Sequence, residues 1–332
     1  MSDDPVRVDV VAASLLPICQ CNIGSEGRNT MPPLAVAGLS MVVDFGGSRM
    51  PNRIVDVPSR DAPTLPLGVR LMSYAHTQLE QAQAELGREG EDRHEGIHRA
   101  RKCIRRTRAA LALGAGAPGQ KAEVLDDELR RLCRGLSYLR DSQALVEVLN
   151  RLDARQSQDA DRTLLSAAEL RARQRRDEIL ERSLVRDPAF MARRIRLKDV
   201  QQRLNFPDGR SLGEDDVRRE IERSRRRVDK AAKQIKKHPD DDDAWHVYRR
   251  RLRRLHQQDT LLNDMIPTWR LSKKRHCELA DVLGESQDDV LLLRCCGRGS
   301  PFTADQRKFL RAIAQERLRR TRSDESAHDW SR

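Results

Sequence analysis

Two nine-residue stretches, HRARKCIRR at residues 98–106 and HVYRRRLRR at residues 246–254, share one pattern. Each begins with histidine and carries basic residues three, four, seven and eight positions later. At about 100° per residue, positions +3, +4 and +7 return to the face of the first residue of an α-helix. Each stretch therefore predicts a helix with one basic face.

The opposite face of each predicted helix is apolar. Helices of this kind bury the apolar stripe against the protein core. In the first helix this stripe consists of Ile97, Ala100, Ile104, Thr107 and Leu111; in the second it consists of Trp245, Tyr248, Leu252 and Leu255.

A second pair of segments repeats at nearly the same distance. LSYLRD at residues 136–141 corresponds to LGESQD at residues 283–288. Two pairs at matching offsets predict the duplication of a helical unit. The halves of the duplicated domain, residues 67–320, are expected at about 67–186 and 212–320.

Helical spacing of apolar residues begins at Leu67, and glycine and proline interrupt it. With few aromatic residues and few β-branched runs, the chain is predicted to be all-α. Helices are expected over Leu67–Leu86, His94–Leu113, Gln120–Leu139, Ser142–Leu152, Thr163–Val185, Ala189–Leu204 and residues 214–237, 244–265, 267–283, 287–295 and 304–320.

The two ends of the chain lack this pattern. Residues 1–66 contain several prolines and no persistent helical period, so this segment is predicted to be a disordered or loosely packed tail. The alternative is that translation begins at Met50 or Met72. Residues 321–332 are expected to form a polar tail.

The composition indicates a polyanionic partner. The 332 residues have a net charge of +12, with 34% charged, 38% apolar and 3% aromatic residues. The charge fits nucleic acid, acidic lipid or a phosphate polymer, although a GC-rich genome would also enrich arginine on exposed helix faces. The recurring apolar residues argue against wholesale disorder, and scarce aromatic residues argue against modules that stack bases.

Cysteines and apolar runs restrict the cellular setting. The seven cysteines include no CxxC pair, which disfavours a disulfide framework or a zinc site and favours a reducing cytosol. The N-terminus carries Asp3 and Asp4 instead of a cationic signal-peptide region, and no apolar run reaches about 18 residues. We therefore expect a cytoplasmic protein that does not enter membranes and needs no metal or cofactor.

The basic faces point to phosphate as the ligand. Like charges at i,i+3 and i,i+4 repel by a few tenths of a kcal/mol, and no glutamate is interleaved in either stripe. Guanidinium groups donate paired hydrogen bonds to phosphate oxygens, and a linear polymer would engage several in series. The histidines either donate to phosphate when protonated or bind a neighbouring carboxylate such as Asp141 or Asp288.

The duplicated pattern resembles the CHAD family, the conserved histidine α-helical domain. The resemblance rests on the His-x-x-Arg stripes and the downstream Leu-Ser/Gly and Arg/Gln-Asp segments, and covers about residues 67–320. It implies two four-helix bundles related by a pseudo-twofold axis around a basic central groove. It also implies binding of inorganic polyphosphate and localisation to polyphosphate granules. Ser137 and Gln287 depart from the usual glycine and arginine.

The resemblance assigns polyphosphate binding to the residues of the stripes and to a few basic neighbours. The stand-alone domain lacks the Glu-x-Glu-x-Lys signature of the CYTH hydrolases, and no catalytic or metal-binding residue is predicted. The binding set is His98, Arg101, Lys102, Arg105, Arg106, Arg108, Arg140, His246, Arg249, Arg250, Arg253, Arg254, Lys273 and Lys274. Lys230, Lys233 and Lys237 also share a helix face, for which solvent exposure is an equal explanation.

Three other functions remain open from the sequence. A nucleic-acid-binding helical protein would use the same stripes, but no recognised nucleic-acid-binding motif supports it. A metal-dependent phosphohydrolase would need carboxylate ligands beside the phosphate, and the run Asp240–Asp243 has no ligand spacing. A scaffold that recruits other proteins to granules is compatible with polyphosphate binding. Protein partners cannot be predicted.

Overall fold

The computed structural model describes residues 65–114, 120–154, 158–204, 212–269 and 274–327. The side chains of residues 120–121, 274–277 and 324–327 lie outside this description, as do the expected N-terminal tail up to residue 64 and residues 328–332. Regular structure in these ranges is helical: α1 (Leu67–Leu86), η1 (Gly90–Asp92), α2 (Arg93–Leu113), α3 (Gln120–Gly135), α4 (Ser137–Asp153), α5 (Asp159–Arg186), η2 (Pro188–Phe190), α6 (Met191–Arg203), α7 (Glu214–Lys237), α8 (Asp242–Met265), η3 (Pro267–Trp269), α9 (Lys274–Cys295) and α10 (Ala304–Ala327).

Several helix boundaries differ from the prediction; among them, the helix expected from residue 267 begins at Lys274, after the short turn η3, and α5 begins at Asp159. The break between α3 and α4 falls at Leu136 instead of Arg140–Asp141, because the weak helix former Gly135 precedes it. The amide of Arg140 bonds to the Leu136 carbonyl at 3.2 Å, so Arg140 lies within α4. Helix α9 continues through Gly284, where a break was expected, and α10 continues past Arg320 to Ala327.

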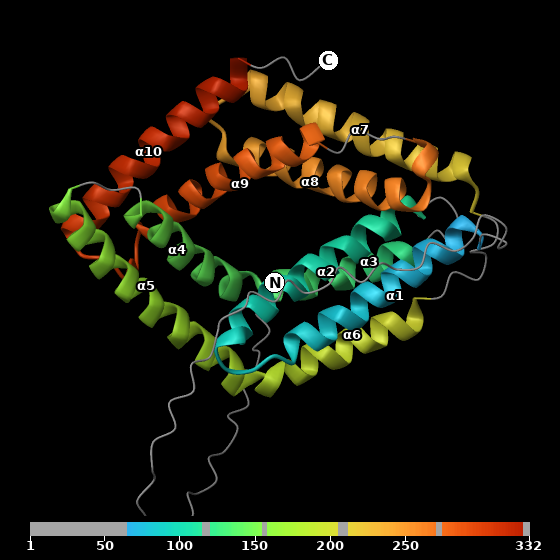
Figure 1. Cartoon of the computed structure of the whole chain (residues 1–332), viewed down its shortest axis with the longest axis horizontal. Helices are drawn as coiled ribbons and strands as arrows, with labels where there is room; N and C mark the ends of the chain where they lie inside the picture. Colours follow the sequence, from blue (N-terminus) through green and yellow to red (C-terminus); the bar gives the residue numbers. More distant parts are fainter. Residues whose placement is uncertain (1–64, 115–119, 155–157, 205–211, 270–273, 328–332) are drawn as a thin grey trace, which may run out of the picture. The chain divides into compact units, whose positions relative to one another are not determined.

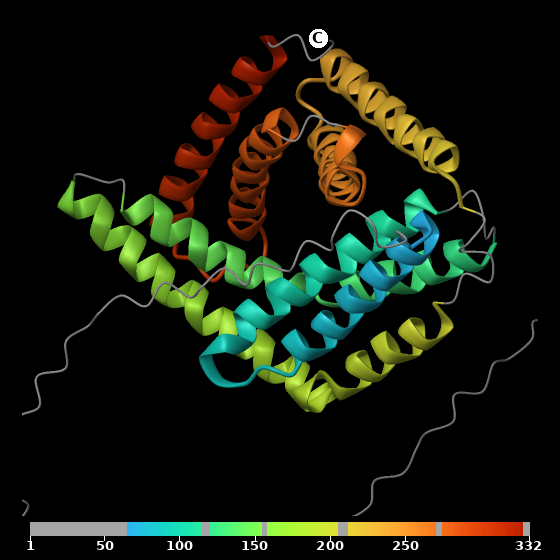
Figure 2. The same ribbon diagram turned by 45° about the vertical axis from the view of Figure 1, so that its right-hand side comes forward.

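Four helices form a closed set of contacts, which we call the inner helices. Helix α2 packs on α4 and α8, and α9 also packs on α4 and α8. Each inner helix is backed by another: α1 against α2, α5 against α4, α7 against α8 and α10 against α9 (Figures 1 and 2). The two predicted basic helices, α2 and α8, are therefore direct neighbours.

Apolar side chains form three cores. The first core joins α1, α2, α3, α6 and the start of α4. The second core joins α7, α8 and α9 with the start of α1 and the end of α2. The third core joins α4, α5, the end of α9 and α10. The third core thus draws on both expected halves of the chain.

The predicted buried faces of α2 and α8 are confirmed. All nine side chains of the two apolar stripes are 5% exposed or less. Burial of these faces against the first and second cores leaves the basic faces turned to the other inner helices or to solvent.

Helix α6 is part of the core and not a linker. Leu197, Val200 and Leu204 are fully or nearly fully buried and belong to the first core. The helix packs on α1 and α3, and Gln201 donates to Glu80 of α1 at 3.1 Å. The first half therefore extends beyond the expected end at residue 186.

In the described part of the chain, none of the helices combines the length and the apolar character that crossing a membrane requires.

Candidate functional site

Five arginines on three inner helices are electrostatic neighbours, and we call them the arginine cluster. Arg101 and Arg105 lie on α2, Arg140 on α4, and Arg249 and Arg253 on α8. The positive charges of Arg253, Arg101 and Arg140 act on Arg105, while Arg105 and Arg140 act on Arg249. Two predicted stripes and the downstream repeat segment are therefore brought together.

Burial lowers the pKa of three members of the cluster, Arg105, Arg249 and Arg253. Burial lowers the pKa of Arg105 to about 10, and the charge of Arg253 adds to the effect. Burial likewise lowers the pKa of Arg249 to about 10, partly opposed by Asp288, and that of Arg253 to about 10, reinforced by Arg249. Because even these values lie well above neutrality, three partly buried cations sit close together at physiological pH.

Three members of the cluster have no direct partner. Arg105, Arg249 and Arg253 make no hydrogen bond or ion pair with the described residues, and the Nε atoms of Arg105 and Arg249 are buried without an acceptor. Buried polar groups in folded proteins are almost always satisfied. These three cations are therefore left without a compensating group among the described residues, as an anion-binding site requires.

The other two members are partly engaged. Arg101 donates through Nη1 to Ser137 Oγ at 2.9 Å and to the Cys133 carbonyl, which ties α2 to the joint between α3 and α4. Arg140 pairs with Glu147, which also lies on α4, at 3.1 Å. Both acceptors of Arg101 are neutral, so neither hydrogen bond balances the charge of Arg101.

Two aspartates border the cluster. Burial raises the pKa of Asp141, and the neighbouring Arg101 and Arg140 oppose this rise. Asp288 on α9 pairs with Arg151 of α4 at 2.6 Å and also attracts Arg249. These carboxylates balance only part of the five positive charges.

The two histidines have different surroundings. His98 is half-buried, and burial together with Arg140 lowers its pKa, while Glu95 and Glu147 act in the opposite direction. The Nδ1 atom of His246, an exposed residue, lies 2.8 Å from Oε1 of Gln287. Of the two alternatives left open for this histidine, the structural one is altered: its neighbour is the amide of Gln287, one residue before the carboxylate of Asp288.

Two arginines of the predicted set share one aspartate that sequence reasoning missed, so only part of their positive charge is balanced. Arg108 binds Asp126 of α3 through two hydrogen bonds of 2.8 and 2.9 Å, and Arg254 approaches the same carboxylate at 3.3 Å. Burial acts to lower the pKa of both arginines. For Arg108 the two hydrogen bonds with Asp126 outweigh burial, and its pKa is raised. For Arg254 burial prevails, and its pKa is lowered. We therefore place this pair at the edge of the site.

The remaining predicted residues are not members of the arginine cluster. Lys102 and Arg250 are exposed, and Arg106 is half-buried near Tyr74. Lys273 falls outside the described residues, and Lys274 begins α9 with an undescribed side chain.

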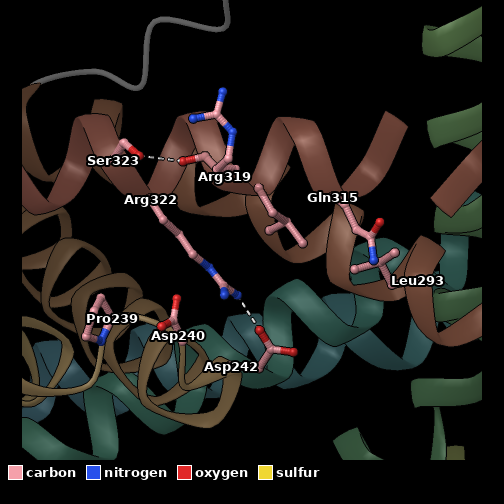
Figure 3. A pocket seen from close by; sticks show the side chains of 9 residues that line it. Pro239, Asp240, Asp242, Leu293, Gln315, Arg319, Arg322 and Ser323 are labelled. Atoms are coloured by element: carbon pink, nitrogen blue, oxygen red, sulfur yellow. Dashed lines mark hydrogen bonds and ion pairs between the residues drawn. The ribbon is translucent and has the colours of Figure 1, made fainter. Parts of the chain in front are cut away.

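A cavity of about 350 Å³ lies elsewhere, between α10 and the segment that leads into α8. Arg322 of α10 pairs there with Asp242 (Figure 3). The same guanidinium lies 6.0 Å from the centre of the Trp245 ring. None of the fourteen predicted binding residues lines this cavity. Among the residues described, no group of three or more His, Cys, Asp or Glu side chains is placed to hold a metal ion.

The inner helices, their duplicated basic stripes and the cluster between them can be compared with known proteins. A family model for the CHAD domain matches residues 73–297, more than half of the chain. The chain belongs to the CHAD family. The comparison with curated proteins found no match.

Two solved structures share the CHAD fold of this chain. The crystal structure of the CHAD domain from the plant Ricinus communis is 18% identical, covers 79% of this chain and 92% of its own, and gives a TM-score of 0.56. PptA from Streptomyces chartreusis is 19% identical, covers 78% and 97% respectively, and gives a TM-score of 0.54. At these identities the likeness concerns the fold alone.

Proposed function

We propose that the protein binds inorganic polyphosphate in its arginine cluster and does not catalyse a reaction on it. The observation that carries the proposal is the set of three partly buried arginines, Arg105, Arg249 and Arg253, without a partner among the described residues. Membership of the CHAD family, which is associated with polyphosphate binding, points to the same ligand.

The energetics favour a ligand with several charges. Uncompensated buried cations destabilise the folded chain, and one polymer with a phosphate at each unit would neutralise several of them together. Each guanidinium donates a fork of hydrogen bonds that fits phosphate oxygens. Counterion release would make the affinity fall with salt.

We further propose that the two halves are related by a pseudo-twofold axis, with the cluster in a basic groove near it. The support is the matching order of contacts: α1 with α2 corresponds to α7 with α8, α4 corresponds to α9, and α5 corresponds to α10. The third core, shared between both halves, would then hold the ends of two bundles together. In a cell that stores polyphosphate, we expect the protein in the cytoplasm, on the granules.

Titration with polyphosphates of defined length tests the proposal. We expect affinity to grow with chain length and to fall at least tenfold when Arg101, Arg105, Arg249 and Arg253 are replaced by Ala. The matched control replaces Arg99, Arg173, Arg175 and Arg319, which are exposed and paired with nearby glutamates, and removes the same charge. Equal losses in both variants would contradict a specific site.

Two further measurements separate the other functions. In competition at moderate salt, duplex DNA should displace polyphosphate poorly; preference for DNA would replace polyphosphate by nucleic acid as the ligand. Incubation of polyphosphate with the protein and Mg²⁺ or Mn²⁺ should release no phosphate. Release that the cluster variant abolishes would instead indicate a phosphohydrolase.

A further inference from the structure

The two halves of helix α7 carry opposite charge. Residues 214–225 contain five acidic and four basic side chains, whereas residues 226–237 contain one acidic and six basic side chains. The second half includes four of the ten lysines in a chain whose basic residues are mostly arginine. Codon usage that favours arginine does not explain this concentration of lysine.

Ion pairing follows the same division. In the first half, Arg219, Arg223 and Arg225 each pair with the acidic residue three positions earlier. In the second half, the four residues that we call the lysine face make no hydrogen bond or ion pair with the described residues. They are Arg226, Lys230, Lys233 and Lys237, and all four are exposed.

Helical geometry places these four side chains in one row. Their spacing of four, three and four residues keeps them on one side of α7, over a length of about 16 Å. The opposite side carries Val228 and Ile235, which are buried in the second core with residues of α8. The lysine face therefore points away from α8 and from the arginine cluster.

Helix stability alone does not account for the row. Cations in the last turn of a helix interact favourably with its dipole, which covers Lys236 and Lys237. The effect falls off within one turn, so it does not extend to Arg226, Lys230 or Lys233. Like charges at these spacings repel one another.

The chemistry of the row favours a plain phosphate polymer. Ammonium groups are compact point charges on flexible stems and lack the rigid, planar donor fork of arginine, so they suit a ligand that offers charge at every unit. None of the described large apolar side chains that are exposed lies on α7, so the face has nothing to stack on bases or to insert into a bilayer.

We propose that the lysine face is a second polyphosphate-binding surface, separate from the arginine cluster, so that one protein chain holds two polymer segments and cross-links them. The inference rests on the proposed function for the identity of the polymer. A polymer segment in the cluster cannot contact the lysine face at the same point, because α7 and the second core lie between them.

A two-step capture experiment tests the bridge. Polyphosphate is attached to beads at low density, the full chain is bound and washed, and a fluorescent polyphosphate is then added. The test variant is Lys230→Gln/Lys233→Gln/Lys237→Gln. The control is Arg219→Gln/Arg223→Gln/Arg225→Gln, which removes three positive charges from the same helix at paired positions.

We expect the lysine variant to bind the beads within twofold of the wild type and to capture at least fivefold less fluorescent polymer, while the control captures it normally. Equal capture by both variants, whether reduced or not, would overturn the inference, since net charge or another surface would then be responsible. Weaker binding of the lysine variant to the beads would show that the face is not a separate site.

The same experiment separates this inference from the proposed function. If the quadruple Ala variant of the arginine cluster captures the fluorescent polymer as the wild type does, the proposed function fails, because the lysine face alone would hold the bead-bound polymer and leave no second site. If that variant loses capture but the lysine variant bridges normally, only the inference fails. Labelled duplex DNA and phosphatidylserine vesicles replace the second polymer in parallel, and stronger capture of either would overturn the choice of ligand.

Discussion

The Nη2 atom of Arg249 lies 3.6 Å from the position that a Cβ atom would occupy at Gly284. At the matching place in the first half of the repeat, Arg101 donates to the hydroxyl of Ser137 at 2.9 Å. One copy of the motif thus fixes its arginine with neutral acceptors, whereas in the other copy the arginine lies beside a glycine and has no partner among the described residues. The departure of Ser137 from the family pattern has a structural role in this chain.

A large side chain at Gly284 should weaken polyphosphate binding. Gly284→Leu would occupy the space beside Arg249 and displace its guanidinium, so we expect at least a fivefold loss of affinity in the titration. Gly284→Ala should be tolerated, because a Cβ at 3.6 Å makes an ordinary contact. The control is Gly135→Ala, whose Cβ would meet nothing within 4 Å. A loss in Gly284→Ala equal to that of Gly284→Leu would point to backbone flexibility instead.

Replacing a cluster arginine with a neutral residue should stabilise the unliganded protein. Arg105→Met and Arg253→Met each remove a cation whose pKa burial lowers to about 10, and we expect the free energy of unfolding in urea to rise by roughly 1–3 kcal/mol. Polyphosphate affinity should fall in the same variants, the usual conflict between function and stability.

The contrasting variant for this test is Arg108→Met. Arg108 makes two hydrogen bonds with Asp126, so its removal should lower the free energy of unfolding by about 1–3 kcal/mol. If the cluster variants were destabilised like Arg108→Met, their arginines would have partners in the folded chain.

Acid should destabilise the free protein through His98. Because its folded pKa is lowered, the unfolded chain binds more protons between that pKa and 6.5, and stability falls as pH falls through this range. A phosphate beside His98 favours the protonated ring, so polyphosphate should raise its pKa and bind more tightly as pH drops. NMR titration of the ring with and without polymer measures the shift.

A second histidine requires a control. His94 also has a lowered pKa, caused by burial and by Arg176, so the stability curve reports both rings. His98→Gln should flatten the pH dependence of binding, whereas His94→Gln should change only stability. An unchanged pH dependence of binding in His98→Gln would place that histidine outside the binding site.

Local periodicity was sufficient to predict α1, the two basic helices and their buried faces, because each depends on residues within a few turns. The sequence also shows that neither basic stripe contains a carboxylate of its own, but it does not show carboxylates that other helices bring to the stripes. Asp126 pairs with Arg108 and Arg254 from another helix, and a partner 128 residues away from Arg254 leaves no periodic signal.

Continuity of helices was harder to predict than their existence. Glycine in a helical pattern reads as a possible break, but Gly284 lies within α9 where space beside Arg249 is needed. The packing of α6 on α1 and α3 depends on tertiary contacts. The assignment of phosphate to the cluster stays a prediction.

Outside the site, the buried carboxylate of Asp289 should make stability depend on pH when its partner is removed. Asp289 is 1% exposed, and Arg317 of α10 donates to both its oxygens at 2.9 and 3.1 Å. Burial raises the pKa of Asp289 to about 6, and Arg317 opposes this rise. The folded chain therefore binds more protons than the unfolded chain between about pH 4 and 6, and this carboxylate costs stability as pH rises through that range.

Arg317→Met leaves the carboxylate buried without its cation and extends this cost to higher pH. Relative to the wild type, we expect a loss of about 3–5 kcal/mol in the free energy of unfolding at pH 8 and a much smaller loss at pH 5, where the carboxyl group takes up a proton. Urea unfolding of the variant and the wild type at pH 8 and pH 5 measures these losses. Arg319→Met, which breaks an exposed pair with Glu316, should leave the free energy of unfolding nearly unchanged at either pH. Equal losses for Arg317→Met at both pH values would mean that packing of the arginine stem, and not its charge, stabilises the contact between α9 and α10.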